Sequence, residues 1–274
     1  MNPFSFEDRR REIIRIDAIK HQQGSTDAQF KNNYLGINSI NLDLTEPLYR
    51  IFNYDYFLKD LQNNTLTLVQ PHSWQDPFEN FLLRSQGRLD DGTIVGFDSI
   101  RDSFYSQCWS QKEECDGLWR NYKGDNQFAI KVKTTSGKLF ENLYDLSNQF
   151  HYLSYFIGKV DYVSDSEIAS YFKDKIDFGD YQSGAEFAST LLLKRKAFAY
   201  EEEVRIIVYE KNNGSENILP VQFDINNAVD EIVFDPWVNE DIFNEKKQEL
   251  IDAGFSGRIT RSGLYNEPFF IAKL

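Results

Sequence analysis

The chain has 274 residues, of which 41% are hydrophobic and 15% aromatic, enough apolar material for one large core and too much for a disordered protein. Its 30 basic and 43 acidic residues give a formal charge of −13, so most of its surface repels nucleic acid and anionic lipid. No apolar run approaches the roughly 18 residues that span a bilayer. Residues 1–15 mix charges where a secretory signal needs an apolar stretch, so the sequence predicts a cytoplasmic protein without a membrane segment.

The chain has few residues that bind metals or form disulfides. Cys108 and Cys115 are too few for a disulfide framework. The three histidines, His21, His72 and His151, do not combine with them into a zinc-binding spacing. We therefore predict two reduced thiols and no metal site.

The N-terminal residues differ in pattern from the rest of the chain. Residues 4–21 predict a charged helix with a short apolar stripe, and residues 22–33 predict a polar linker. We interpret residues 1–33 as an N-terminal arm and residues 34–274 as an α+β domain. The arm could dock a partner or pack on its own domain.

From residue 47 onward, strand and helix patterns alternate. Strands are predicted at residues 48–52, 65–69, 104–110, 127–132, 155–163, 200–209, 219–223, 231–234 and 269–272. Helices are predicted at residues 54–61, 77–82, 113–122, 138–149, 180–193 and 240–253, the fourth starting near Lys138 and the last closed by Gly254. No internal repeat is present. The order indicates an α+β fold of mixed, mostly antiparallel strands with flanking helices.

An acidic pair stands at the start of a late predicted strand. Side chains alternate across a strand, so Glu201, Glu203 and Arg205 are expected on one face. Two carboxylates roughly 7 Å apart repel each other unless a positive group lies between them. A metal ion or a developing cation on a substrate could supply that charge, which makes the pair a candidate site.

Basic residues give two further signals. Arg50 lies inside an otherwise apolar strand, where a guanidinium needs a carboxylate or the phosphate of a ligand as its partner. The runs Arg9–Arg11 and Lys194–Lys196 are the candidates for a local nucleic-acid patch, and we predict that both are solvated helix faces.

Four motifs together resemble a bacterial family of uncharacterised function that is suspected in phage defence. They are Tyr49-Arg50, Ser73-Trp74-Gln75-Asp76-Pro77-Phe78-Glu79, Trp119-Arg120-Asn121-Tyr122 and Tyr200 to Arg205. The resemblance covers residues 48–210.

The order of Arg50, a strand ending in Ser110 and then Glu201-x-Glu203 is similar to the Arg-Ser-Glu class of ADP-ribosyltransferases, which includes DNA-modifying toxins. The Ser-Thr-Ser triplet usual in that class is absent, and Cys108-Trp109-Ser110 stands in its place. This resemblance implies a split β core, NAD as substrate, and a toxin or antiphage effector that modifies a nucleic-acid or protein acceptor. A neutralising antitoxin protein is then expected as a partner.

The resemblance also implies roles for individual residues. Cleavage of the nicotinamide–ribose bond develops an oxocarbenium-like cation, which Glu203 would stabilise, while Glu201 would orient or deprotonate the acceptor. Arg50 would grip the pyrophosphate or the ribose, and Ser110 would hydrogen-bond the nicotinamide ribose. Three aromatic residues are candidates for stacking on nicotinamide or an acceptor base: Tyr49, Trp109 and Trp119.

Three other interpretations remain open. Asp76, Glu79 and the acidic pair could hold Mg²⁺ in a nuclease, with Arg205 on the scissile phosphate. Cys108 could serve a cysteine hydrolase, although no His and Asn partners lie in local register. In a non-catalytic binding or sensing module, the acidic pair and Arg205 would form a salt-bridge ladder with Arg50.

Overall fold

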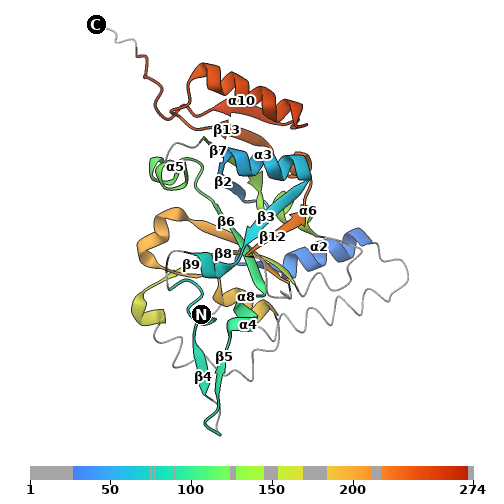
Figure 1. The fold of residues 1–274 in the computed structure, drawn as a ribbon, viewed down its shortest axis with the longest axis vertical. Coiled ribbons are helices and arrows are strands. Elements are labelled where there is room, and N and C mark those ends of the chain that lie inside the picture. Colours follow the sequence, from blue (N-terminus) through green and yellow to red (C-terminus); the bar gives the residue numbers. More distant parts are fainter. Residues whose placement is uncertain are drawn as a thin grey trace.

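The computed structural model describes residues 27–74, 76, 78–88, 91–123, 128–144, 154–168, 184–210 and 217–270. Within these residues, ten strands form one mixed sheet that runs through the molecule (Figure 1). In order across the sheet they are β1 (Ser39–Ile40), β8 (Tyr155–Lys159), β11 (Glu203–Tyr209), β6 (Phe104–Ser110), β2 (Pro47–Asn53), β7 (Ala129–Thr135), β13 (Glu231–Phe234) and β14 (Arg258–Arg261). Two more strands, β3 (Thr65–Val69) and β12 (Ile218–Gln222), branch from β6.

Most neighbouring strands are antiparallel, and the pairs β1–β8 and β13–β14 are parallel. Two small ribbons accompany the sheet: β9 (Asp161–Val163) pairs in parallel with β10 (Leu193–Arg195), and β4 (Gln86–Arg88) pairs with β5 (Ile94–Gly96). The predicted fold class, α+β with mixed and mostly antiparallel strands, is confirmed.

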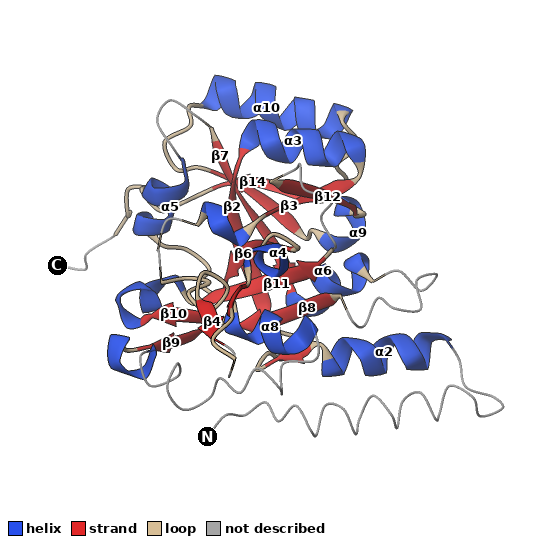
Figure 2. Cartoon of the chain, turned by 60° about the horizontal axis from the view of Figure 1, so that its bottom comes forward, coloured by secondary structure: helices blue, strands red, loops and turns tan. Residues whose placement is uncertain are grey.

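Helices flank both faces of the sheet. The α-helices are α2 (Asp27–Ile37), α3 (Tyr54–Asn63), α4 (Asp98–Arg101), α5 (Asp116–Lys123), α6 (Ser136–Leu143), α8 (Gly184–Thr190), α9 (Ile225–Ala228) and α10 (Glu240–Asp252), and the 3₁₀ segments are η1 (Pro71–Ser73) and η3 (Lys196–Glu201). Figure 2 shows α3 and α10 next to each other, and the Tyr54 hydroxyl lies 2.9 Å from both the Lys246 carbonyl and the Glu249 carboxylate. In the described part of the chain, no helix combines the length and the apolar character of a membrane span.

The sheet separates two apolar cores. On β11, Val204, Ile206 and Val208 pack in the larger core with residues of α3, α6 and α10, whereas Ile207 packs in the smaller core with residues of α8. Because successive side chains of a strand point to opposite faces, an apolar run of this kind indicates a strand covered on both sides. β11, which begins at Glu203 of the acidic pair, is therefore packed between the two cores.

Most predicted helices and strands are confirmed, with boundaries within one to four residues of the predicted ones. The larger differences have identifiable causes. The helix predicted at 77–82 is absent. Asp76 accepts the backbone N–H of Phe78 as a helix cap would, but Asn80 has a φ of 56° and donates to the Pro71 carbonyl, so the chain turns back at once. The strand predicted at 155–163 is split, because Val160 bonds to the Glu203 carbonyl and Asp161 to the Leu192 carbonyl.

Other boundaries were wrong. Residues 27–33 belong to α2 instead of a linker, and 269–270 are not in a strand, whereas β14 was missed. The predicted helix at 180–193 is shorter, because Leu193 already belongs to β10. The predicted N-terminal helix at 4–21 lies outside the described residues, and the division of the chain at residue 33 stays a prediction.

Truncation of the buried centre of β11 tests this packing. We expect Ile206→Ala to lower the free energy of unfolding by about 2–5 kcal/mol, because Ile206 is fully buried in the larger core. Val95→Ala, on the exposed strand β5, is the matched control and should change it by less than about 0.5 kcal/mol. Urea titrations measure both values, and equal losses would contradict the assigned core.

Candidate active site

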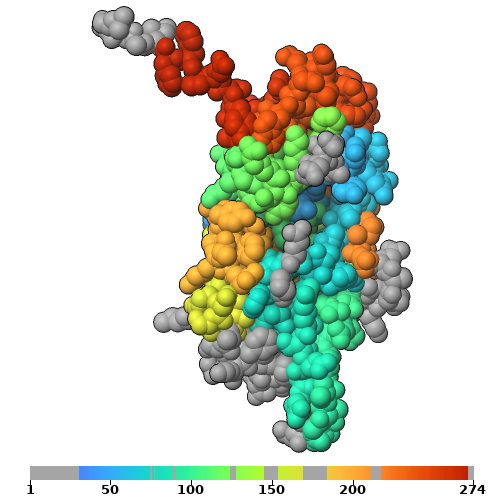
Figure 3. Space-filling model, turned by 60° about the vertical axis from the view of Figure 1, so that its left-hand side comes forward, coloured from blue at the N-terminus to red at the C-terminus, as the bar shows by residue number. Residues whose placement is uncertain are grey.

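A split in the sheet opens a pocket between β2 and β6. The two strands pair only at Tyr49 and Ser110, because β6 then pairs with β3 while β2 continues along β7. A guanidinium N–H of Arg50 donates to the Cys108 carbonyl across this split. The pocket is open to solvent, and its empty volume, which includes solvent space at the mouth, is about 490 Å³. Figure 3 shows α5 (green) lying above the segment of β10 and η3 (light orange) on one face of the molecule.

The pocket brings together every residue that the sequence predicted for the site. All seven line it: Tyr49, Arg50, Trp109, Ser110, Trp119, Glu201 and Glu203. Three of them form a row across neighbouring strands, because Tyr49 is opposite Ser110 and Ser110 is opposite Glu203. Residues directly opposite each other in antiparallel strands share a face of the sheet, with Cβ atoms about 4.5–5.5 Å apart.

The acidic pair is not arranged as one strand would arrange it. Glu203 begins β11, but Glu201 ends η3, and Glu202 between them has a left-handed φ of 46°. The Ser110 hydroxyl donates to the Glu201 carbonyl at 2.6 Å and so fixes this turn. The expectation that Glu201 lies on the strand was therefore wrong, although the turn does return its carboxylate to the side of Glu203.

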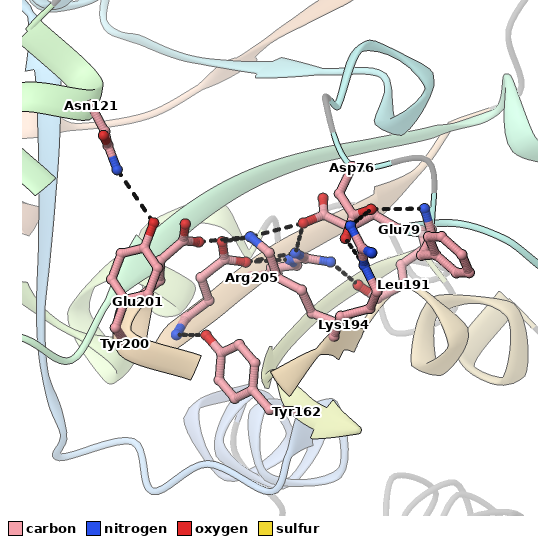
Figure 4. A network of polar contacts seen from close by, with 12 residues as sticks. Asp76, Glu79, Asn121, Tyr162, Leu191, Lys194, Tyr200, Glu201 and Arg205 are labelled. Carbon is pink, nitrogen blue, oxygen red and sulfur yellow. Dashed lines mark hydrogen bonds and ion pairs between the residues drawn. The ribbon is translucent and has the colours of Figure 1, made fainter. Parts of the chain in front are cut away.

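The positive group between the two carboxylates is Lys194. Its ammonium lies 2.6 Å from Glu201, 2.6 Å from Glu203 and 2.8 Å from Glu79 (Figure 4). Lys194 was predicted on a solvated helix face, but it lies on β10, where alternation turns it inward and leaves Arg195 partly exposed. No local pattern marks this lysine as buried. Only the need of the acidic pair for a countercharge could have indicated it.

A second internal cation holds the other side of Glu203. Arg205 is fully buried, and its guanidinium lies 2.6 Å from Glu203, 3.3 Å from Glu79 and 4.2 Å above the ring of Trp74. It also donates to the Leu191 carbonyl at 2.6 Å. The salt-bridge ladder considered as an alternative is thus confirmed between Arg205 and Glu203 and wrong for Arg50, whose place is taken by Lys194.

The pKa values of Glu201 and Glu203 are shifted in opposite directions. Burial, together with the neighbouring Glu203, raises the pKa of Glu201 to about 7, against the attraction of Lys194. Burial would also raise the pKa of Glu203, but Arg205 and Lys194 overcome it and lower that pKa to about 2. Two carboxyl groups whose environments separate their pKa values are suited to different chemical tasks, one ionised and one exchanging protons near neutral pH.

Each of Arg50 and Arg205 has one buried guanidinium nitrogen without a hydrogen bond, but among the described residues only Arg205 has carboxylate partners. The Nε of Arg50 is buried without a hydrogen-bond partner, and no carboxylate among the described residues lies within ion-pair distance of its guanidinium. The guanidinium lies 4.8 Å from the ring centroid of Phe52, and burial lowers its pKa. A positive charge without a protein anion in a pocket is suited to an anionic group of a ligand.

The aromatic residues form the wall of the pocket. Trp119 is fully buried and donates to Glu114 at 3.1 Å, and Trp109 donates to Gln107 at 2.9 Å. Tyr122 on α5 also lines the pocket and is half exposed, so it is the aromatic side chain best placed to contact a ligand. Its signal was present in the Trp-x-x-Tyr motif, because residues three apart on a helix share a face.

The geometry disfavours two of the other interpretations. The ammonium of Lys194 occupies the position that a metal ion would need among the carboxylates, and the described residues contain no group of three or more metal-binding side chains suited to an ion. Burial raises the pKa of the Cys108 thiol to about 12, which keeps it protonated and poorly nucleophilic.

Comparison with known proteins assigns the chain to no family. No family model and no curated protein matches the chain. Solved structures of DarT from Thermus sp. 2.9 are similar to it over 81% of its length and 96–97% of theirs. The complex with NAD⁺ has 12% identity and a TM-score of 0.37, the complex with ADP-ribosylated ssDNA 12% and 0.38, and the complex with carba-NAD⁺ 10% and 0.36. TM-scores below 0.5 do not establish a function.

The ion pairs of Glu203 predict how stability depends on pH. Its pKa is lowered in the folded state from an ordinary value of 4.5 to about 2, so the unfolded chain binds this proton more readily. The stabilisation is therefore present above about pH 4.5 and is lost as the pH falls toward 2. We expect Glu203→Gln to cost about 3–5 kcal/mol at pH 7 and progressively less in acid.

Urea titrations of the wild-type protein and of Glu203→Gln at a series of pH values measure this difference. A difference that stays constant from pH 7 to pH 3 would show that Glu203 is not ionised by its partners in the folded state.

Proposed function

We propose that this protein is an NAD-dependent ADP-ribosyltransferase. The observation that supports it most strongly is the arrangement, within one pocket, of a guanidinium without an ion-pair partner among the described residues, a serine, and a carboxylate held by two cations. Three neighbouring strands contribute these groups. The pyrophosphate of NAD needs the first of these groups, and the sugar cation that forms when nicotinamide leaves needs the last.

Arg50 would bind the pyrophosphate. Its guanidinium has a buried donor without a partner among the described residues, so a phosphate oxygen would complete its hydrogen bonding and balance its charge at once. The hydroxyl proton of Ser110 is already donated to the Glu201 carbonyl. A ribose hydroxyl would therefore donate to Ser110 Oγ.

Glu203 would stabilise the oxocarbenium-like transition state. Lys194 and Arg205 each hold one of its oxygens at 2.6 Å, which fixes the carboxylate and keeps it ionised before the substrate arrives. A preorganised charge of this kind stabilises developing charge without reorganisation during the reaction.

Glu201 would accept the proton of the attacking nucleophile. A base with a pKa of about 7 is partly ionised at neutral pH and binds the transferred proton strongly enough to be effective.

The acceptor would be a nucleic acid or a protein. On α5, Arg120 and Lys123, which pair with Asp116 and Asp235, lie 5.2 and 4.9 Å from the ring centroid of the exposed Trp237, an aromatic surface that suits a stacked nucleobase. A role as a toxin or antiphage effector with a neutralising partner is part of the same proposal.

A non-catalytic binding or sensing module is the second candidate. The observation in its favour is that both oxygens of Glu203 already have internal cationic partners, as in a purely structural ion-pair network. In that case the protein would release no nicotinamide from NAD⁺.

Removal of the charge of Glu203 tests the enzymatic proposal. We expect Glu203→Gln to lower nicotinamide release from labelled NAD⁺ by about 10²–10³-fold, because the sugar cation loses its carboxylate. Glu202→Gln is the matched control, since its exposed carboxylate contacts only Lys112 among the described residues, and it should retain the wild-type rate. Circular dichroism establishes that both variants are folded.

Separate protein, RNA and DNA pools in the same assay identify the acceptor. A wild-type protein that neither labels a pool nor releases nicotinamide would reject the proposal.

The proton affinity of Glu201 predicts the pH profile. Glu201 acts as a base only when ionised, so we expect kcat/KM for nicotinamide release to rise as the pH increases through about 7 and then to level off. Glu201→Gln should lower the plateau and remove the step. An unchanged step in Glu201→Gln would assign the titration to another group.

A further inference from the structure

The buried charges around Lys194 do not balance when all of them are ionised. The cluster contains three carboxylates and two cations: Glu79, Glu201, Glu203, Lys194 and Arg205. Each of these side chains is less than 10% exposed. Two positive and three negative charges leave a net charge of −1 in a site shielded from water, which is strongly unfavourable. The cluster is neutral when it holds one proton.

The geometry indicates which carboxylate holds that proton. Glu203 has a cation on each oxygen, and one oxygen of Glu79 is shared by Lys194 and Arg205. Glu201 has only Lys194 as a cationic partner among the described residues, through a single oxygen. Glu201 also lines the pocket, as Glu203 does, whereas Glu79 does not. It is therefore the carboxylate with the least compensation and with a route to solvent.

We propose that Lys194 is a positioning residue that keeps Glu203 ionised and confines the single proton of the cluster to Glu201 at the pocket. The Lys194 ammonium contacts all three carboxylates, so its charge affects the pKa of each of them. The chemical use of this proton rests on the proposed function. Its placement does not, because it follows from the charges and contacts of the protein itself.

Other titratable groups around the acidic pair do not take over this role. They are Asp76 beside Arg195, Tyr162 on β9, Tyr200 on η3, Tyr122 on α5, Cys108 on β6 and Arg50 on β2. Asp76 and Arg195 neutralise each other at 2.8 Å. Arg50 is a further cation, but no carboxylate of the described residues lies within ion-pair distance of it, so it is not part of the contact network around Lys194. Burial raises the pKa of Tyr122, Tyr162 and Cys108, so these groups stay protonated and neutral near pH 7.

Two substitutions with opposite effects on the charge balance test the inference. Lys194→Met removes a positive charge, and we expect the pKa of Glu201 to rise by about one to three units. Glu79→Gln removes a negative charge while it retains the size and polarity of the side chain, and we expect the pKa of Glu201 to fall by about one unit or more. Lys194→Arg keeps the charge and should restore the wild-type value. Carboxyl-carbon NMR of glutamate-labelled protein, assigned with Glu201→Gln, measures each pKa in the absence of substrate.

The step in the pH profile of nicotinamide release should move in the same directions as the NMR midpoints. Lys112→Met is the matched control, because Lys112 is a partly exposed lysine that contacts Glu202 outside the cluster, and it should shift neither value. Circular dichroism establishes folding, and if Lys194→Met does not fold, Glu79→Gln decides alone. A purely structural role for Lys194 predicts lower stability with an unmoved midpoint, and that result, or a midpoint unmoved in Glu79→Gln, would overturn the inference.

The same experiments separate this inference from the proposed function. NMR midpoints that shift as expected in a protein that releases no nicotinamide would reject the enzymatic activity and retain the proton site. Nicotinamide release with unmoved midpoints would retain the enzyme and reject the role of Lys194.

Discussion

The ion-pair cluster centred on Lys194 is the constraint on which the arrangement of the site depends. Its ammonium joins the turn that carries Glu79 to the end of η3 and the start of β11, which follow each other much later in the chain. Buried charges of this kind are favourable only when every partner is present, so each segment is held in place by the others. The acidic edge of the pocket is therefore fixed by electrostatics in addition to the apolar cores on both sides of β11.

The two arginines of the site, Arg205 fully buried and Arg50 half-buried, differ in the groups that surround them. Arg205 is surrounded by two carboxylates, a carbonyl and the face of Trp74. Its charge is therefore balanced within the protein and is not available to a ligand. Arg50 lies where β2 and β6 part, and its partners among the described residues are a backbone carbonyl and an aromatic ring. The split in the sheet thus leaves one positive charge for a ligand, in a pocket that the acidic pair also lines.

The acidic pair gains its chemical asymmetry from a backbone detail. The left-handed conformation at Glu202 ends η3 and directs Glu201 and Glu203 to one side, while Glu202 itself contacts Lys112 at the surface. Glu203 lies between two cations and stays ionised, whereas Glu201 has one and retains a proton near pH 7. Two identical side chains two residues apart can therefore act as a charge and as a base.

The sequence by itself determined the fold class, most strands and helices, and seven of the residues that line the pocket. Alternating apolar residues indicate strands such as β2, β3 and β6, and the charges inside or beside them are unusual enough to mark a site. Only the tertiary structure decided that Lys194 is buried, that Arg50 and the acidic pair do not contact each other as ion-pair partners, and that Glu201 lies in a turn. The physical reason is that the pairing of buried charges depends on how turns and neighbouring segments bring side chains together, as η3 does for Lys194 and Glu201, and local periodicity carries no information about these contacts.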